Sequence, residues 1–398
     1  MAILSDIRKN INLPLFLPAG AASLGIFFFL YSIRSLGSKE PEVIPSPRET
    51  LLPRLSKEEI KNLPYPPDAL PGARDVDSPY GSIRVYEWGP LNGEKILFIH
   101  GISTPSIALG GLAHKLVEKN CRVMLFDLFG RGYSSAPSPY THPYSSALYT
   151  TQIHLVLQSS PLSWSTSPFT LIGYSLGGAL AADFTSYFPR LISHLFLIAP
   201  GGLIRTSHVT WKSRLLYSTS GLLPEWLIEK MVARRLWTGP EGARSIEPEP
   251  DVAVEKEKER TGGLQSRAVY LSGNIGLIPE RPNSTAGYVV DGQILCHKGF
   301  VPAFISSIRY APIHEQHHRW MIIGERMREG FFPLKKVNLI LGEIDPIIIA
   351  DEITEDAREL LGQEFMDVRP VKGAGHEVPI QRVDEVAGII AEGLGRTW

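Results

Sequence analysis

The sequence predicts an α/β fold with a doubly wound, mostly parallel sheet and a long helical insertion between the sixth and seventh strands. Two patterns carry this prediction. Short apolar runs, typical of strands buried on both faces, alternate with segments whose apolar residues have helical spacing. The alternation stops near residue 205 and resumes near residue 333. One sheet interrupted by an insertion explains both patterns.

Local patterns place the individual elements. The stretch 82–88 alternates apolar and polar residues, which predicts a half-exposed antiparallel strand. Leu109, Leu112 and Leu116 have helical spacing and predict a helix over 107–118. The nearly continuous apolar runs that predict buried strands are 95–100, 122–128, 169–174 and 195–199, and two later strands are predicted over 337–342 and 365–371.

Composition narrows the class of partner. The 398 residues are 43% hydrophobic, enough for one sizeable core. Forty Lys and Arg residues face 41 Asp and Glu residues, so the formal net charge is −1. This balance does not favour a polyanion, and we expect no nucleic-acid partner. We expect no cofactor either.

The amino-terminal region predicts a membrane anchor over residues 1–36. No charged residue occurs from 13 to 33, and basic residues flank the stretch on both sides. Pro14 and Pro18 limit the uninterrupted helix to about 22 Å, short of a bilayer core of about 30 Å. A cleavable signal peptide or a buried helix therefore stays an alternative. With a single-pass anchor we expect an internal membrane such as the endoplasmic reticulum.

The rest of the chain divides into three parts. Residues 37–74 contain many prolines and read as a linker or a surface wrap. The core comprises 75–205 and 333–398, because the strand and helix patterns fall there. The intervening residues 206–332 form the helical insertion.

The most informative motif surrounds Ser175. An apolar strand leads into Gly-Tyr-Ser-Leu-Gly, so Ser175 occupies a sharp strand-to-helix turn. Gly173 and Gly177 carry no side chains, which lets the strand and the following helix approach each other. This arrangement is typical of a nucleophilic serine.

A serine hydroxyl needs a base, and the base needs an acid that orients it. Asp345 follows the strand at 337–342, and His376 lies in a glycine-rich loop after the strand that ends at 371. Both positions lie beyond the carboxyl ends of strands, where open α/β sheets carry their sites. Glu343 is the alternative orienting acid.

These motifs together resemble the α/β-hydrolase superfamily. The resemblance rests on His100-Gly101, on Asp127-x-x-Gly-Arg-Gly-Tyr-Ser, on the turn at Ser175, and on Gly342-x-x-Asp and Gly375-His376. It implies a catalytic triad of Ser175, Asp345 and His376. It also implies an oxyanion hole formed by the backbone amides of Ile102 and Leu176.

The resemblance implies a serine hydrolase that cleaves a carboxylic ester, with a lipid-derived ester as a candidate, through an acyl-enzyme. Chemistry that runs through an aspartyl ester is disfavoured because the nucleophile is Ser175. A thioester or amide substrate, C–C bond hydrolysis, acyl transfer to an alcohol and a catalytically silent binding protein stay open.

A competing motif lies in the insertion. His314-Glu315-x-x-His318 matches His-Glu-x-x-His, which binds zinc when both histidines share one face of a helix. No third ligand has a recognisable motif, so we expect the polar face of a cap helix and no metal.

The resemblance implies that the insertion over 206–332 is a lid or cap over the site. Apolar residues gather early in it. We expect them to hold the lid to the core, with contact to lipid as the alternative. They are Trp211, Leu215, Leu216, Leu222, Leu223, Trp226, Leu227 and Met231.

Overall fold

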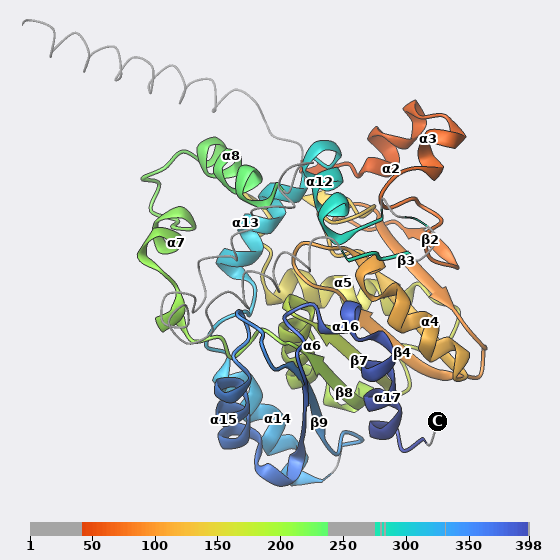
Figure 1. Cartoon of the computed structure of the whole chain (residues 1–398), viewed down its shortest axis with the longest axis vertical. Helices are drawn as coiled ribbons and strands as arrows, with labels where there is room; N and C mark the ends of the chain where they lie inside the picture. Colours follow the sequence, from red (N-terminus) through yellow and green to blue (C-terminus); the bar gives the residue numbers. More distant parts are fainter. Residues whose placement is uncertain (1–41, 238–274, 279–280, 282–283, 331, 397–398) are drawn as a thin grey trace, which may run out of the picture. The chain divides into compact units, whose positions relative to one another are not determined.

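Eight strands form the central sheet of the computed structural model, which describes residues 42–237, 275–278, 281, 284–330 and 332–396. The sheet order is β10-β9-β8-β7-β4-β5-β3-β2, and neighbours from β10 to β5 are parallel (Figure 1). The predicted mostly parallel α/β sheet is therefore confirmed. In chain order, the strands are β2 (Ala73–Val76), β3 (Ile83–Trp88), β4 (Glu94–Ile99), β5 (Cys121–Phe126), β7 (Phe169–Tyr174), β8 (Ile192–Ile198), β9 (Val337–Gly342) and β10 (Met366–Val371).

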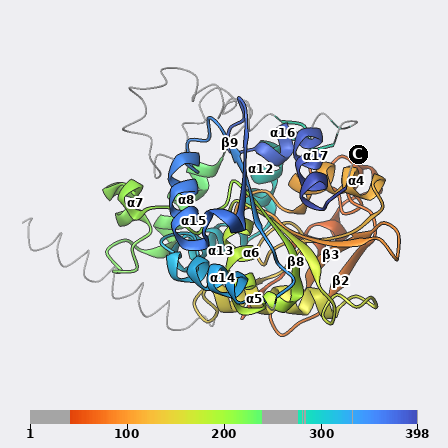
Figure 2. The ribbon, with the colours of Figure 1, turned by 90° about the horizontal axis from the view of Figure 1, so that it is seen from below.

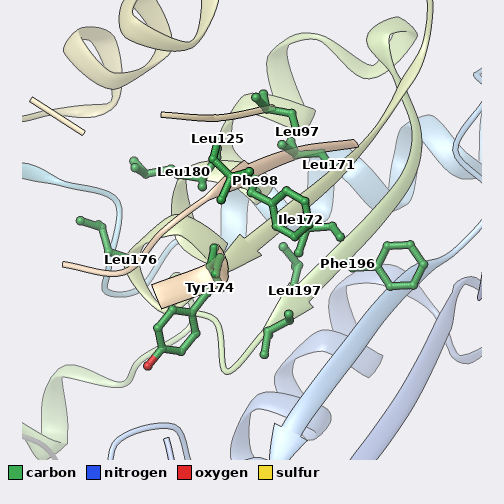
Figure 3. Close-up of a cluster of buried hydrophobic side chains, with 14 of the residues drawn as sticks. Leu97, Phe98, Leu125, Leu171, Ile172, Tyr174, Leu176, Leu180, Phe196 and Leu197 are labelled. Carbon is green, nitrogen blue, oxygen red and sulfur yellow. The ribbon is translucent and has the colours of Figure 1, made fainter. Parts of the chain in front are cut away.

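Apolar side chains fill both faces of the sheet centre. Successive residues of a strand point to opposite faces, so a strand covered on both sides must be apolar throughout. Phe98 on β4, Ile172 on β7 and Phe196 on β8 lie in this cluster and are buried (Figure 3). Each such side chain stabilises the fold by about 1.5–3 kcal/mol.

Helices cover the sheet in two layers. One layer contains α4 (Gly110–Glu118), α16 (Val378–Gln381) and α17 (Val383–Gly393), which contact one another (Figure 2). The other contains α5 (Ser146–Gln158), α6 (Leu176–Tyr187) and α14 (His317–Glu329). The helix α15 (Ala350–Leu361) packs against α14 and the edge strand β10.

Strand β3 is antiparallel, as predicted, but the expectation that one of its faces is exposed is wrong. Arg84 and Glu87 are both buried on it. Arg84 lies 3.2 Å from Asp75, and Glu87 pairs with Arg74 at 2.8 Å and Arg122 at 3.1 Å. Ion pairing and hydrogen bonding permit these charges to be buried. The polar residues that alternate with apolar ones in this strand are therefore buried, paired charges and do not form a solvent-exposed face.

The described part of the proline-rich segment contains short elements. They are β1 (Val43–Ile44), which pairs with β6 (Ala136–Pro137), then α2 (Pro47–Thr50), a 3₁₀ turn (Leu52–Arg54) and α3 (Lys57–Lys61). The segment ends in β2, the edge strand of the main sheet. Tyr65 is buried, and its hydroxyl donates to Tyr86 at 2.7 Å. The segment thus packs onto the sheet edge.

No helix within the described residues is long and apolar enough to cross a bilayer. The predicted anchor over 1–36 falls outside the described residues and stays a prediction.

The insertion lies between β8 and β9, which are the sixth and seventh strands of the main sheet in chain order. Its described helices before α14 are α7 (Trp211–Leu216), α8 (Glu225–Leu236), α12 (Ala286–Cys296) and α13 (Phe300–Tyr310). Ile228, Val232 and Phe304 belong to a second hydrophobic cluster that these helices share. The helical character of the insertion is as predicted.

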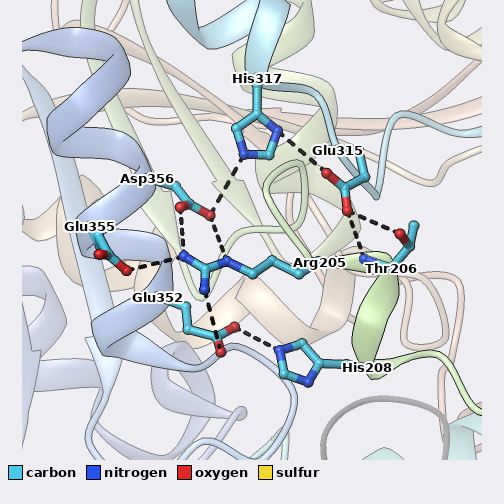
Figure 4. Close-up of polar contacts among 8 residues, drawn as sticks. All are labelled: Arg205, Thr206, His208, Glu315, His317, Glu352, Glu355 and Asp356. Carbon is cyan, nitrogen blue, oxygen red and sulfur yellow. Dashed lines mark hydrogen bonds and ion pairs between the residues drawn. The ribbon is translucent and has the colours of Figure 1, made fainter.

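An ion-pair cluster joins the start of the insertion to α15 (Figure 4). Arg205 donates to both oxygens of Asp356, at 2.7 and 3.2 Å, and to Glu355 at 3.1 Å. His208 lies 2.8 Å from Glu352 on the same helix. The Asp356 side chain is 10% exposed and that of Glu355 is 72% exposed. Asp356 is therefore the better shielded partner of Arg205.

We predict that Asp356→Ala lowers the free energy of unfolding by about 1–2 kcal/mol, because it removes a shielded, bidentate partner of Arg205. Glu355→Ala is the matched control and should change it by less than about 0.5 kcal/mol, since exposed pairs contribute little. Equilibrium urea unfolding of both variants measures the difference. Equal losses of unfolding free energy in the two variants would contradict the conclusion that Asp356 is the more important partner of Arg205.

Candidate active site

The turn after β7 carries Ser175 in a strained conformation. Its φ is +54° and its ψ is −119°, which non-glycine residues rarely adopt. A Cβ atom on Gly173 would lie 2.2 Å from the carbonyl oxygen of Gly177. A Cβ atom on Gly177 would lie 2.0 Å from the carbonyl oxygen of Ile99. Only glycine permits this approach of β7, α6 and β4.

Backbone hydrogen bonds hold the strained residue in place. The amide of Ser175 donates to the carbonyl of Ile198 at 3.0 Å, and its carbonyl accepts from the amide of Gly201 at 3.0 Å. The amide of Gly178 donates to the same carbonyl at 2.9 Å. These bonds connect the turn to the end of β8, and they offset the cost of the unfavourable φ.

The structure brings Ser175, His376 and Asp345 together. His376 Nε2 lies 2.9 Å from Ser175 Oγ, and His376 Nδ1 lies 2.8 Å from Asp345 Oδ2. The Asp345 side chain is inaccessible to solvent, and its Oδ1 accepts from the amides of Ile347 and Ile348 at 2.8 and 2.9 Å. Asp345 is thus fixed on the side away from the histidine.

Glu343, the alternative acid, has a different place. It is exposed, and its carboxylate accepts from the amide of Gly373 at 2.8 Å. It thereby steadies the loop that precedes His376. The carboxylate at His376 Nδ1 is that of Asp345.

Two buried side chains fix the loop that carries Ile102. His100 Nε2 accepts from the amide of Leu128 at 2.9 Å, so Nδ1 carries the proton and donates to the carbonyl of Gly101 at 2.7 Å. Burial lowers the pKa of His100 to about 3, which keeps the ring neutral. That carbonyl belongs to the same peptide as the Ile102 amide, and its hydrogen bond polarises the amide.

Arg131 holds the next carbonyl of this loop. It is fully buried, and its guanidinium donates to the Ile102 carbonyl at 3.0 Å and to Phe129, Tyr149 and Ser307 at 2.8–3.2 Å. In the described part of the chain, no carboxylate lies within ion-pair distance of it. All four groups that accept from this guanidinium are neutral oxygens.

The amides of Ile102 and Leu176 have no hydrogen-bond acceptor among the described residues. Leu176 is the first residue of α6, where helix geometry leaves the amide without an intrahelical acceptor. A Cβ atom on Gly101 would lie 3.5 Å from Ser175 Cβ, so the loop borders the serine. Both amides are therefore available beside Ser175.

Sequence reasoning missed Glu377, which follows His376 directly. Its carboxylate accepts from the hydroxyl of Tyr174 at 2.6 Å, and burial raises its pKa. The Tyr174 ring lies 5.5 Å from the His376 ring, between centroids. The sequence did show an acidic residue next to the candidate histidine His376. The burial of Glu377 could not be predicted, because it depends on contact with Tyr174, which is distant in sequence.

The His-Glu-x-x-His motif does not form the helix that zinc binding requires. Helix α14 begins only at His317, and Glu315 has a φ of +52°. His314 and His318 therefore do not share a helix face, and the expected cap-helix face is wrong as well. Glu315 instead accepts from the amide of Thr206 at 2.8 Å. The described residues contain no group of three or more His, Cys, Asp or Glu arranged to hold a metal.

Comparisons with known proteins agree with this architecture. An uncharacterized protein of Mycobacterium tuberculosis is 29% identical over 155 residues, which is 39% of this chain and 43% of that protein. A serine hydrolase-like protein of Danio rerio is 29% identical over 128 residues, 32% of this chain and 37% of its own length. The chain thus spans less than half the length of these relatives.

A solved structure supports the fold over nearly the whole chain. A bacterial membrane phospholipase A has a TM-score of 0.54 and 16% identity, with 96% of each chain covered. The model of the alpha/beta hydrolase family matches residues 96–389, most of the 398 residues. The chain belongs to the alpha/beta hydrolase family.

Proposed function

We propose that this protein is a serine hydrolase that cleaves a carboxylic ester. The observation that carries the proposal is the chain of contacts from Ser175 Oγ to His376 Nε2 at 2.9 Å and from His376 Nδ1 to Asp345 at 2.8 Å. The family and the serine hydrolase-like relatives support the reaction class. In this proposal the insertion between β8 and β9 is a lid that shapes the acyl pocket.

The reaction begins with attack of Ser175 Oγ on the acyl carbon while the hydroxyl proton moves to His376 Nε2. Asp345 stabilises the imidazolium through Nδ1–H. The amides of Ile102 and Leu176 donate to the tetrahedral oxyanion. The ester C–O bond then breaks, and His376 returns the proton to the leaving alcohol.

Water completes the cycle. It loses a proton to His376 as its oxygen attacks the acyl-serine, and Ser175 leaves with that proton as a carboxylic acid is released. A thioester or amide substrate would use the same steps, as would acyl transfer with an alcohol in place of water. p-Nitrophenyl esters of graded acyl length, run beside thioester and amide substrates, rank these alternatives.

Ser175→Ala should abolish labelling by a fluorophosphonate probe and reduce ester hydrolysis by about 10⁴-fold or more, because the nucleophile is lost. Ser207→Ala, an exposed serine in the insertion, is the control and should label like the wild type. Gel fluorescence and initial rates measure both effects. Absence of labelling in the wild type would favour a catalytically silent binding protein.

Asp345→Asn should lower kcat by about 10⁴-fold, since an amide beside Nδ1 favours the wrong tautomer of His376. Glu343→Gln is the matched control and should keep kcat near the wild-type value, because Glu343 accepts from Gly373 instead. Steady-state kinetics on a soluble ester decides between them. A larger loss in Glu343→Gln would reassign the orienting acid.

Arg131→Lys should lower kcat by about 10- to 100-fold with little change in KM, because Ile102 meets the oxyanion in the transition state. The rates are normalised to active sites counted by fluorophosphonate titration, which separates misfolding from a catalytic loss. Arg122→Lys perturbs a partly buried arginine at the amino end of β5 and should leave kcat unchanged. An unchanged kcat in Arg131→Lys would remove its positioning role.

A further inference from the structure

The segment 211–237, which contains the first two insertion helices α7 and α8, exposes large apolar residues beside basic ones. We call this set the cap face. We propose that the cap face docks on an anionic lipid bilayer. In Figure 1, α7 and α8 lie at the upper left, away from the sheet. The cap face comprises Trp211, Leu215, Leu222, Trp226, Lys230, Met231, Arg234 and Trp237.

The apolar members of the cap face are open to solvent. Trp211 is 70% exposed, Leu222 is 73% exposed and Trp226 is 48% exposed. On the inner side, Leu216 and Leu223 pack against the second cluster, whose buried residues all belong to the insertion, so these two residues hold the insertion helices to one another. Exposed tryptophans and leucines gathered within 27 residues of the chain are candidates for a contact surface.

Helical spacing separates the two sides of α8. Ile228 and Val232, one turn apart, are buried in the second cluster. Trp226, Lys230 and Arg234 follow one another at intervals of four and are exposed, so they line the opposite side. On α7, Trp211 and Leu215 have the same spacing and are exposed. Each helix therefore presents an outer strip of its own.

The charge of this region suits an anionic surface. Five basic and two acidic residues occur from 211 to 237. One of the acids, Glu225, accepts from Arg309 at 3.0 Å, so its charge is compensated. Tryptophan rings sit at the headgroup level of bilayers, while Lys and Arg side chains reach lipid phosphates. Tryptophan mixed with basic residues thus favours a bilayer over an acidic protein partner.

The inner side of α8 is connected to the candidate active site through the second cluster. Ile102, whose amide is a proposed oxyanion donor, is partly buried and packs against this cluster, to which α8, α12 and α13 contribute the buried residues. A bilayer bound on the outer side would place ester lipids near the lid. This use of the cap face rests on the proposed function, whereas docking itself does not.

Hydrogen exchange of the full-length protein, followed by mass spectrometry, tests the proposal. Exchange is compared without vesicles, with phosphatidylcholine vesicles, and with phosphatidylcholine vesicles that contain phosphatidylserine. Peptides from α7 and α8 should exchange more slowly with the phosphatidylserine vesicles than in the other two samples. Equal protection by phosphatidylcholine alone, or protection by neither vesicle, would overturn the proposal.

Charge variants separate docking by the cap face from attachment elsewhere in the chain. Lys230→Gln with Arg234→Gln should raise the phosphatidylserine-vesicle concentration needed for protection by about 25-fold, since each basic residue contributes about fivefold. Lys335→Gln with Lys336→Gln, two exposed lysines before β9, should not change it. Equal protection in both double variants would contradict docking by the cap face.

A soluble short-chain ester distinguishes this inference from the proposed function. Without vesicles, Lys230→Gln with Arg234→Gln should hydrolyse it at the wild-type rate. An inactive wild type that still shows phosphatidylserine-dependent protection would refute the hydrolase proposal and leave the docking surface standing. A wild type that hydrolyses the ester but shows no slower exchange of α7 and α8 with vesicles would support the hydrolase proposal and refute docking by the cap face.

Discussion

The close approach of three backbone segments at Ser175 is the constraint on which the candidate site depends. Strand β7, helix α6 and the end of β4 meet where only hydrogen atoms fit, at Gly173 and Gly177. Ser175 is thereby held at a φ of +54° with its hydroxyl facing His376. The strained turn persists because burial of the surrounding sheet contributes much more free energy than the unfavourable φ of one residue costs. The stable packing around the turn thus fixes the position of Ser175 Oγ.

Buried polar groups extend this rigidity to the loop beside the serine. Neutral His100 and charged Arg131 bind consecutive carbonyls of the loop, so the intervening Ile102 amide has a fixed direction. Arg131 also reaches Ser307 on α13, which connects the loop to the insertion. The loop beside Ser175 and the insertion thus share one buried hydrogen-bond network.

The sequence predicted the parts of the structure that depend on local patterns. The strands at 169–174 and 337–342 have the predicted bounds because each is apolar except for one residue, Thr170 and Asn338, and a turn follows each of them. Ser175, Asp345 and His376 each follow a strand, which predicted that they lie close together, and the structure brings them into contact. Glu377 was not singled out because its partner Tyr174 lies 203 residues away. The contact of Arg131 with the Ile102 carbonyl joins two loops 29 residues apart, and its contact with Ser307 spans 176 residues. The spacing of His314 and His318 did not predict their arrangement, because Glu315 has a positive φ and the helix begins only at His317.

The most direct test of the account is a crystal structure of the protein after reaction with an organophosphonate, a mimic of the tetrahedral intermediate. The account predicts phosphorus bonded to Ser175 Oγ, with the phosphoryl oxygen at about 2.7–3.1 Å from the amides of Ile102 and Leu176. Phosphorus on another side chain, or a phosphoryl oxygen that points away from both amides, would contradict it.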